Sequence, residues 1–431
     1  MAVVRPFRGI LYDAAVVGSI ASVVAPPYDV VGPEEQNRLY EASPFNVIRL
    51  DLSRESDRYG SASRTFAQWC AQGALARDRA PAFYVYVQRY RLKDSEERER
   101  FGFFTRLRLE EFASGKVLPH EKTLASAKAD RLALQRACRA NLSSIFGLYS
   151  APGFSLAEAA RGTLGASPWT DFADVASVRH RLWRLTDEGI QRALERRLEA
   201  RTVYIADGHH RYETALRYRD EMRAATGRRG GQEPFDYVLA YLVNMDEPGL
   251  VILPTHRLLR ELPIAARPLI ERLRRSFRVE EVPRSDGRNA FVARLRCGAG
   301  ERRIGMVLRG QDRFFVLVTR DGENDERLAG STALRRLDVT LLHGLVLEGA
   351  GSILALDAHR EAEAGRLVYS KDEDEAVGRV ESGEFAAAFL LNPTGVDEVR
   401  AVAEAGETMP EKSTYFYPKI ATGLVFNSLE D

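Results

Sequence analysis

The chain has 431 residues, of which 45% are hydrophobic and 9% aromatic, as in a globular protein and unlike a disordered one. Its 62 basic and 61 acidic residues leave a net charge of +1. This balance argues against a broad basic surface for duplex DNA or for an anionic membrane. At this length we expect two or three lobes rather than one core.

The cysteines and the apolar runs bear on the compartment of the protein. Cys70, Cys138 and Cys297 lie far apart and form no Cys-X-X-Cys pair, so neither a disulfide framework nor a zinc ribbon is expected. Residues 1–13 lack the apolar run of a signal peptide. No stretch reaches the roughly 18 apolar residues that read as a transmembrane helix. The sequence therefore predicts a cytoplasmic protein.

In the first part of the chain, Pro33 and the acids after it predict the start of a helix. NVIRLDL (46–52) predicts a strand, and residues 63–75 an amphipathic helix. Residues 82–92 and 99–109 alternate apolar and polar side chains on either side of a charged turn, which predicts a β-hairpin.

Further along, residues 111–149 read as a loop followed by a helix, and the charged helix within 187–201 leads into the strand 202–207. A helix follows from Arg211, and the glycine-rich segment 227–234 is the clearest linker. The remaining predicted elements are the strands 237–244 and 251–256, a helix over 265–277, a hairpin of 302–310 and 313–320, helical residues 333–347 and a strand within 385–392.

Strands and helices mix without a strict βαβ rhythm, so we predict an α+β fold of mixed sheets with packed helices. We expect an N-terminal α+β lobe over residues 1–110 and a central lobe over 111–228. A C-terminal α+β lobe over 233–431 would have a tail that packs back on the core.

The turn Asp207-Gly208-His209-His210-Arg211 joins a predicted strand to a predicted helix. A helix beginning after Gly208 presents unpaired N–H groups and the positive end of its dipole, and Arg211 offers a bidentate fork for phosphate. Asp207 can orient a histidine, hold a magnesium ion or accept a hydroxyl proton. We therefore predict a site for a phosphate-bearing ligand.

Two alternatives explain the same turn. In the first, Asp207 caps the helix and the histidines are ordinary polar turn residues. The second is a catalytic zinc, although His120-Glu121 lacks the His-Glu-X-X-His spacing.

The segment LPHEKTLASAKADR (118–131) carries a second group of polar residues. Glu121, flanked by His120 and Lys122, can act as a general base toward a hydroxyl. Lys122, Lys128 and Arg131 can neutralise transferred phosphoryl charge. A solvated loop that opens a helix explains the same composition equally well.

The tail MPEKSTYFYPKIATGLVF (409–426) is too aromatic for a free terminus, so we expect it to pack on the body. No glycine precedes Lys412-Ser413-Thr414 as a P-loop requires, and no Gly-X-Gly-X-X-Gly follows a strand. Lys412, Ser413, Thr414 and Lys419 can still contact an anion. The alternative is a packing segment with exposed lysines.

Five blocks, in order along nearly the whole chain, resemble the bacterial and archaeal domain-of-unknown-function family 1015: APPYDVV (25–31), LPHEKT (118–123), IADGHHRYETAL (205–216), LPTHR (253–257) and MPEKSTYFYPK (409–419). The strand followed by DGHHR is also similar to the nucleotide-handling box of the ParB/sulfiredoxin-like fold. That fold includes partitioning proteins that bind CTP, sulfiredoxins that use ATP, and kinases that phosphorylate free serine.

The resemblance implies a ParB/sulfiredoxin-like nucleotide-binding core. Our leading hypothesis is a kinase-type phosphotransferase that uses ATP or ADP with Mg²⁺ on a small hydroxylated substrate such as free serine. Glu121, Asp207 and His209 would be catalytic, with Asp207 also holding the metal. The residues expected to bind the nucleotide phosphates are Gly208, His210, Arg211, Lys122, Arg131, Lys412, Ser413, Thr414 and Lys419.

Two other functions fit the residues. One is a ParB-like regulatory or DNA-associated protein that binds nucleotide, although the balanced charge makes nucleic acid an unexpected partner. The other is a metal-dependent hydrolase using His120, His209 and His210. We expect a nucleotide and a small molecule as partners and no membrane. The sequence leaves the substrate and the oligomeric state open.

Overall fold

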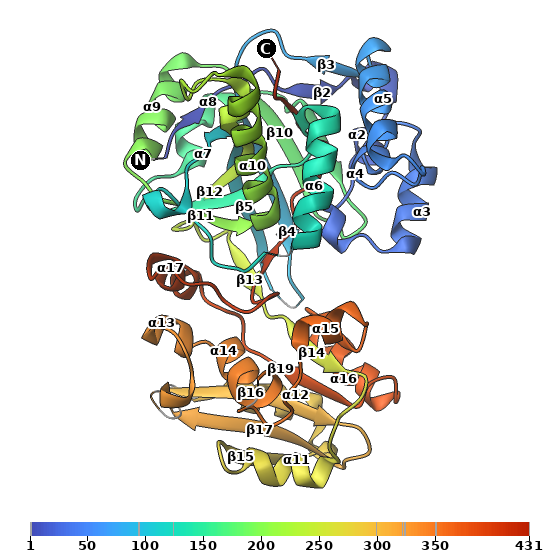
Figure 1. Cartoon of the computed structure of the whole chain (residues 1–431), viewed down its shortest axis with the longest axis vertical. Helices are drawn as coiled ribbons and strands as arrows, with labels where there is room; N and C mark the ends of the chain where they lie inside the picture. Colours follow the sequence, from blue (N-terminus) through green and yellow to red (C-terminus); the bar gives the residue numbers. More distant parts are fainter. Residues whose placement is uncertain are drawn as a thin grey trace. The chain divides into compact units, whose positions relative to one another are not determined.

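The computed structural model describes residues 2–93, 95–123, 125–298, 300–320, 322, 325–349 and 351–430. The chain divides into two compact units (Figure 1). Unit 1 comprises Met1–Pro119, Thr123–Val251 and Pro418–Asp431, and unit 2 comprises His120–Lys122 and Ile252–Tyr417. Both units combine sheets with helices, so the chain has a mixed α+β fold, as predicted. The unit boundaries do not coincide with the expected lobe boundaries, and the expected linker 227–234 lies inside unit 1.

Unit 1 is built on a nine-stranded sheet. Its strand order is β6 (Val117–Leu118), β11 (Val203–Asp207), β8 (Ile145–Tyr149), β12 (Tyr237–Asn244), β5 (Glu97–Arg108), β4 (Phe83–Arg91), β10 (Arg179–Leu185) and β9 (Thr170–Ala173), with β1 (Val4–Arg5) paired to β5. β11 runs parallel to β6, and β12 runs parallel to β8. The predicted hairpin is confirmed as β4 and β5. All eight residues of β12 are buried, as expected for a sheet covered on both faces.

Two helices of unit 1, α6 (Ala125–Cys138) and α10 (His209–Thr226), pack side by side (Figure 1). The predicted charged helix is α9 (Glu188–Glu199), where the Asp187 carboxylate accepts a hydrogen bond from Ile190 N and so caps the first turn. The other helices of unit 1 are α1 (Ala14–Val17), α2 (Ile20–Val23), α3 (Pro33–Ala42), α4 (Ile48–Asp51), α5 (Arg58–Ala71), α7 (Leu156–Ala159) and α8 (Arg161–Leu164).

The strand expected at residues 46–52 is wrong, because this segment forms the short helix α4. The side chain of Asn46 accepts a hydrogen bond from Ile48 N and donates to the carbonyls of Ser22 and Val24. Such a local bond to the backbone two residues on turns the chain and competes with a sheet ladder. The helix buries Ile48, Leu50 and Asp51, so apolar residues read as an alternating strand pack as one helical turn.

The end of the tail belongs to unit 1. Phe426 and Ile10 exchange two backbone hydrogen bonds of 2.9 Å. The strand β21 (Asn427–Ser428) pairs with β7 (Ala140–Asn141), and β2 (Ile10–Tyr12) pairs with β3 (Leu75–Arg77). The buried hydrophobic residues in this part of the tail are Leu424, Val425, Phe426 and Leu429.

Unit 2 is built on a six-stranded antiparallel sheet. The strand order is β15 (Arg278–Pro283), β17 (Arg313–Arg320), β16 (Glu301–Leu308), β19 (Ala387–Leu390), β14 (His256–Leu259) and β18 (Leu367–Ser370). The predicted hairpin of β16 and β17 and the predicted strand β19 are confirmed. The expected strand 251–256 is divided into β13 (Val251–Leu253), which pairs with β20 (Tyr415–Tyr417), and the start of β14.

The core of unit 2 lies between this sheet and the helices α12 (Gly287–Arg296) and α16 (Glu373–Glu381), where Phe291 and Val377 pack with Leu258 and Val307. The other helices are α11 (Ala266–Leu273), α13 (Thr332–Arg335), α14 (Asp338–Leu342), α15 (Ala358–Glu363) and α17 (Val396–Glu404). A π-helical turn, His343–Leu347, continues α14.

Candidate functional site

The strand–turn–helix of unit 1 has the geometry of an anion site. β11 ends at Asp207, Gly208 adopts φ +90° at the N-cap position, and α10 begins at His209. Since a glycine supplies no capping side chain, the first N–H groups of this 18-residue helix face the turn together with the positive end of its dipole. His209 is 4% exposed and His210 is half-buried.

The Asp207 carboxylate is held between two cations. Its Oδ2 accepts a hydrogen bond of 2.5 Å from Lys419 Nζ, and its Oδ1 lies 3.5 Å from Arg211 Nη2. Asp207 and Lys419 are 212 residues apart in the chain. The tail therefore brings one of its predicted phosphate-binding residues directly to the predicted turn.

Arg211 lies flat against the turn. Its guanidinium donates a hydrogen bond to the carbonyl of Ser144. A Cβ added to Gly208 would stand 3.0 Å from Arg211 Nε and 3.1 Å from Cζ. Glycine is thus required at this position both for its backbone conformation and for the room that the guanidinium occupies.

Arg131, on α6, is buried in an ion-pair network. It donates to Asp51 Oδ1 at 2.6 Å and to Asp130 Oδ2, and its guanidinium lies 4.1 Å from the centre of the Tyr28 ring. Burial raises the pKa of Tyr28 to about 12, while the charges of Arg211 and Arg131 oppose the shift. The pKa of Tyr28 thus responds to both arginines.

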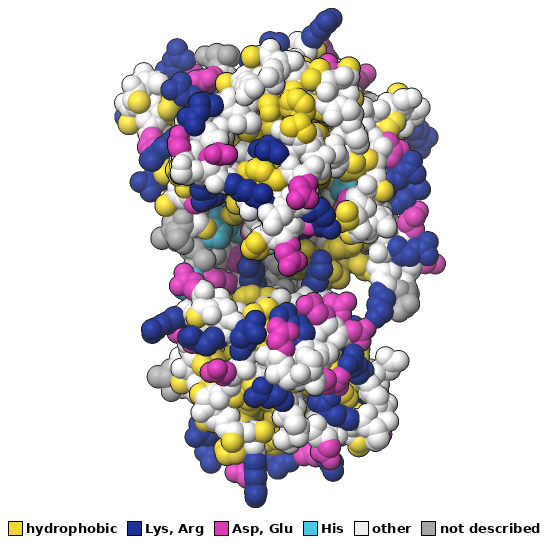
Figure 2. Space-filling view, turned by 90° about the vertical axis from the view of Figure 1, so that its right-hand side faces the viewer, with side chains coloured by type: hydrophobic (Ala, Val, Ile, Leu, Met, Phe, Trp, Pro, Cys, Tyr) yellow, Lys and Arg dark blue, Asp and Glu magenta, His cyan; other side chains and the backbone are white. Residues whose placement is uncertain are grey.

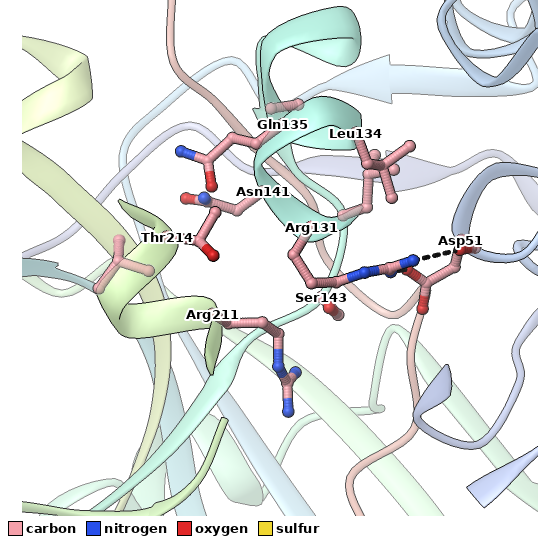
Figure 3. A pocket seen from close by; sticks show the side chains of 11 residues that line it. Asp51, Arg131, Leu134, Gln135, Asn141, Ser143, Arg211 and Thr214 are labelled. Carbon is pink, nitrogen blue, oxygen red and sulfur yellow. Dashed lines mark hydrogen bonds and ion pairs between the residues drawn. The ribbon is translucent and has the colours of Figure 1, made fainter. Parts of the chain in front are cut away.

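A small polar pocket lies beside these groups (Figure 3). Its volume is about 40 Å³. In Figure 3 the Arg131 side chain reaches from α6 to Asp51, and Arg211 extends from the first turn of α10. The lining residues are Asp51, Arg131, Leu134, Gln135, Ala140, Asn141, Leu142, Ser143, Arg211, Thr214 and Val238.

The other predicted site residues lie in unit 2. The Glu121 carboxylate accepts a hydrogen bond from the backbone N–H of Lys412, which has φ +54°. His120 Nε2 lies 3.0 Å from Thr414 Oγ1, and Ser413 Oγ donates to the carbonyl of Pro410. The loop at 409–414 and the His120–Lys122 segment are therefore one local structure.

The buried side chain of Arg257 holds the 409–414 loop in place. Its side chain is fully buried, and Nη2 donates to the carbonyls of Glu411 and Lys412 at 3.2 and 3.1 Å. Burial lowers the pKa of Arg257 to about 10, and the nearby Glu121 and Glu348 oppose the shift. The guanidinium therefore holds the loop whose N–H binds Glu121.

The chemistry of the donors limits which metal fits. Within the described ranges, no group of three His, Cys, Asp or Glu side chains is arranged to hold a metal ion. At the turn, Asp207 supplies one carboxylate, already in contact with Lys419 and Arg211. A Mg²⁺ at this turn would take one ligand from Asp207 and its other ligands from phosphate oxygens and water.

The surface charge and the helices bear on the expected partners. On the face in Figure 2, Lys and Arg side chains alternate with Asp and Glu over both units, without a continuous patch of one sign. None of the helices in the described segments combines the length and apolar composition needed to cross a bilayer.

A family model, Protein of unknown function (DUF1015), matches residues 4–340 of the chain. The chain belongs to this family. No curated protein matches it in sequence.

Solved structures similar to this DUF1015 protein include a conserved hypothetical protein from Pyrococcus furiosus, with 14% identity, 77% of this chain and 95% of that chain covered, and a TM-score of 0.34. A free serine kinase in complex with AMP is 12% identical, with coverages of 73% and 86% and a TM-score of 0.36. SbnI with a C-terminal truncation, from Staphylococcus aureus, is 10% identical, with coverages of 75% and 86% and a TM-score of 0.35.

The five sequence blocks of this DUF1015 chain meet in two places. In unit 1, Tyr28 of the first block, the Asp207–Arg211 turn and Lys419 of the last block lie together with Arg131. In unit 2, Glu121, Arg257 and the 409–414 loop lie together. The predicted site residues thus divide between the units, with Asp207, Gly208, His209, His210, Arg211, Arg131 and Lys419 in unit 1 and Glu121, Lys122, Lys412, Ser413 and Thr414 in unit 2.

Sequence reasoning missed Asp51 and Tyr28. Tyr28 stands inside a block that carried the resemblance, so its position was a usable signal. Asp51 stood in the segment interpreted as a strand, and nothing in its neighbours marked it as a buried partner of Arg131.

Proposed function

We propose that this DUF1015 protein is a nucleotide-dependent phosphotransferase that acts on a small hydroxylated substrate such as free serine. One observation carries the proposal: the N-terminus of α10, Arg211 and Lys419 surround the Asp207 carboxylate with positive charge. A phosphate placed at this turn would receive backbone N–H groups, a guanidinium fork and an ammonium group together.

Asp207 supports the use of a nucleotide–Mg²⁺ complex. Asp207 would supply one ligand to a Mg²⁺ that also binds phosphate oxygens, and such an ion would neutralise charge on the transferred phosphoryl group. Lys419 and Arg211, which contact Asp207, would then bind the remaining phosphate oxygens. Phosphoryl transfer depends mainly on such positioning and charge neutralisation.

Glu121 is the proposed general base. In the transfer step the substrate hydroxyl oxygen forms a bond to the terminal phosphorus, the bond from that phosphorus to the nucleotide breaks, and the hydroxyl proton passes to the general base. The nucleotide leaves one phosphate shorter. The N–H of Lys412 and the buried Arg257 give the Glu121 carboxylate a fixed local frame, which suits a positioned base.

The proposal is tested by incubating the protein with Mg²⁺, ATP or ADP, and a set of hydroxylated amino acids, with phosphorus NMR to detect a new phosphate monoester. We expect transfer and a nucleotide-dependent rise in melting temperature. The absence of both contradicts the proposal. A thermal shift without transfer favours the nucleotide-binding regulatory alternative instead.

Variants separate the assigned roles. Arg211→Met and Lys419→Met should each weaken nucleotide binding about tenfold or more, because each removes a charged donor to phosphate. Arg217→Met is the matched control, since Arg217 lies on the same helix and its exposed side chain pairs with Glu221. Glu121→Gln should lower kcat roughly a hundredfold or more with little change in nucleotide affinity, as expected for loss of a base.

A further inference from the structure

A buried carboxylate oxygen at the pocket between α6 and α10 lacks a hydrogen-bond donor among the described residues. Asp51 is 4% exposed, and its Oδ1 accepts the bond from Arg131 Nη1. In the part of the chain that the structure describes, Asp51 Oδ2 has no hydrogen-bond partner. Such an oxygen is costly to bury unless a donor reaches it. Asp51 lines the pocket, which has room for a small group.

Two other acceptors near the pocket are already engaged. The side-chain oxygen Oδ1 of Asn141 accepts from both Leu239 N and Asn427 Nδ2 at 3.0 Å. The Ser144 carbonyl accepts from Arg211. Asp51 Oδ2, by contrast, is a buried charged acceptor without a hydrogen bond among the described residues, so it can take one from an incoming group.

The charges of the lining select a neutral group. An anionic group would meet the Asp51 carboxylate, and a cationic group would meet the guanidinium groups of Arg131 and Arg211, which also line the pocket. A hydroxyl both donates and accepts, so it can donate to Asp51 Oδ2 while it accepts from a guanidinium. Leu134, Ala140, Leu142 and Val238 give the walls an apolar part that suits the carbon skeleton of a sugar.

The pocket adjoins the proposed phosphate site through one residue. Arg211 lines the pocket and also approaches Asp207 and Gly208 at the turn. A ligand that binds its phosphate at the turn therefore has the pocket beside it.

We propose that the pocket receives a sugar hydroxyl of the nucleotide, and that Asp51 is the specificity-determining residue that accepts its hydrogen bond. The inference rests on the proposed function, because it assumes that the nucleotide phosphates bind at the α10 turn. It assigns to the nucleotide a ribose rather than a deoxyribose sugar.

The experiment compares the affinity of the full-length protein for ADP, 2′-deoxy-ADP and 3′-deoxy-ADP by calorimetry in the presence of Mg²⁺. We expect one deoxy analogue to bind about tenfold or more weakly than ADP, since a hydroxyl bond to a buried carboxylate is lost. In Asp51→Asn, ADP should weaken to the level of that analogue, and the difference between the two nucleotides should largely disappear.

Asp130→Asn is the matched control, because Asp130 also pairs with Arg131 but is not among the residues that line the pocket. It should keep the wild-type discrimination. If Asp130→Asn loses discrimination as Asp51→Asn does, the effect arises from Arg131 and the inference is overturned.

The other possible results distinguish failure of this inference from failure of the proposed function. If the wild-type protein binds ADP and both deoxy analogues equally, the inference fails while the proposed function stands. If ADP does not bind at all, the proposed function fails and the inference fails with it. A loss of phosphoserine affinity in Asp51→Asn, with ADP affinity unchanged, assigns the pocket to the substrate and also overturns the inference. Equal wild-type affinities for ADP and both deoxy analogues overturn the inference even if Asp51→Asn does not fold.

Discussion

At the scale of single residues, Gly208 connects the backbone of the turn to the position of Arg211. Its φ of +90° disfavours any other residue, and a Cβ there would stand 3.0 Å from Arg211 Nε. We predict that Gly208→Ala lowers the free energy of unfolding by about 1–2 kcal/mol. We also predict a weaker affinity for nucleotide, because the guanidinium has to move. Urea unfolding and a nucleotide titration measure the two effects.

Gly227 provides the control at the other end of the same helix. It also has a positive φ, of +71°, and a Cβ added there would meet nothing within 4 Å. Gly227→Ala should therefore cost a similar unfolding free energy while leaving nucleotide affinity unchanged. Equal affinity of the two variants for nucleotide would show that Arg211 is not placed by Gly208.

Asp338 gives unit 2 a pH-dependent stability. Burial raises the pKa of its carboxyl to about 6 from a usual 3.8, although Asn392 Nδ2 donates to Oδ2 at 3.0 Å. Between these two values the folded state binds more protons than the unfolded state, so stability falls as pH rises from about 4 to 6. The raised pKa corresponds to roughly 3 kcal/mol of lost stability at neutral pH.

We predict that Asp338→Asn removes this loss, because an amide oxygen still accepts from Asn392 and carries no charge. The variant should be more stable than the wild type at pH 7, and the difference should shrink toward pH 4. His256, whose pKa burial lowers to about 4, acts in the opposite direction as pH falls from 6.5. Urea unfolding curves of both proteins between pH 4 and 7.5 isolate the Asp338 contribution, and a difference that does not vary with pH would contradict it.

At the scale of elements, the sequence predicted those whose local pattern and tertiary environment agree. The alternating residues of β4 and β5 and the strand, turn and helix around Gly208 formed as predicted. The segment 46–52 did not, because the Asn46 side chain bonds to three backbone groups and turns the chain into α4. Alternation of apolar and polar residues does not reveal whether a neighbouring strand is available to pair with the predicted strand.

The tail makes its own contribution to the core of unit 1. The Phe426 side chain is fully buried, and its ring lies 5.8 Å from that of Tyr12 and 5.9 Å from that of Phe66. We predict that Phe426→Ala lowers the free energy of unfolding of unit 1 by about 3–5 kcal/mol. Val175→Ala is the control, since Val175 is 85% exposed and its loss should change stability by less than about 0.5 kcal/mol. A small effect of Phe426→Ala would mean that the tail is not part of the cooperative core.

At the scale of the whole molecule, the division into units could not be predicted from composition. The glycine-rich segment 227–234 has the composition of a linker, yet it joins α10 to β12 within unit 1. The true passages between units follow residues 119, 122, 251 and 417, and two of them enclose only His120–Lys122. A three-residue excursion into another unit leaves no mark in hydropathy or charge. For the same reason, the distribution of the predicted site residues over two units was not foreseeable from their spacing.

Because each unit has its own hydrophobic core, we expect that the unfolding of the two units can be measured separately. All three tryptophans of the chain, Trp69, Trp169 and Trp183, belong to unit 1, so tryptophan fluorescence reports on that unit. We predict that ADP with Mg²⁺, at about a hundred times its Kd, raises the unfolding free energy followed by fluorescence by about 2.7 kcal/mol. Phe426→Ala should lower the unfolding free energy of this fluorescence transition, and Asp338→Asn, in unit 2, should leave it unchanged.

Circular dichroism, which also detects the helices of unit 2, should then show a second transition that responds to Asp338→Asn and not to ADP. If both probes shift together with every change, the two units do not unfold separately, and the prediction is contradicted.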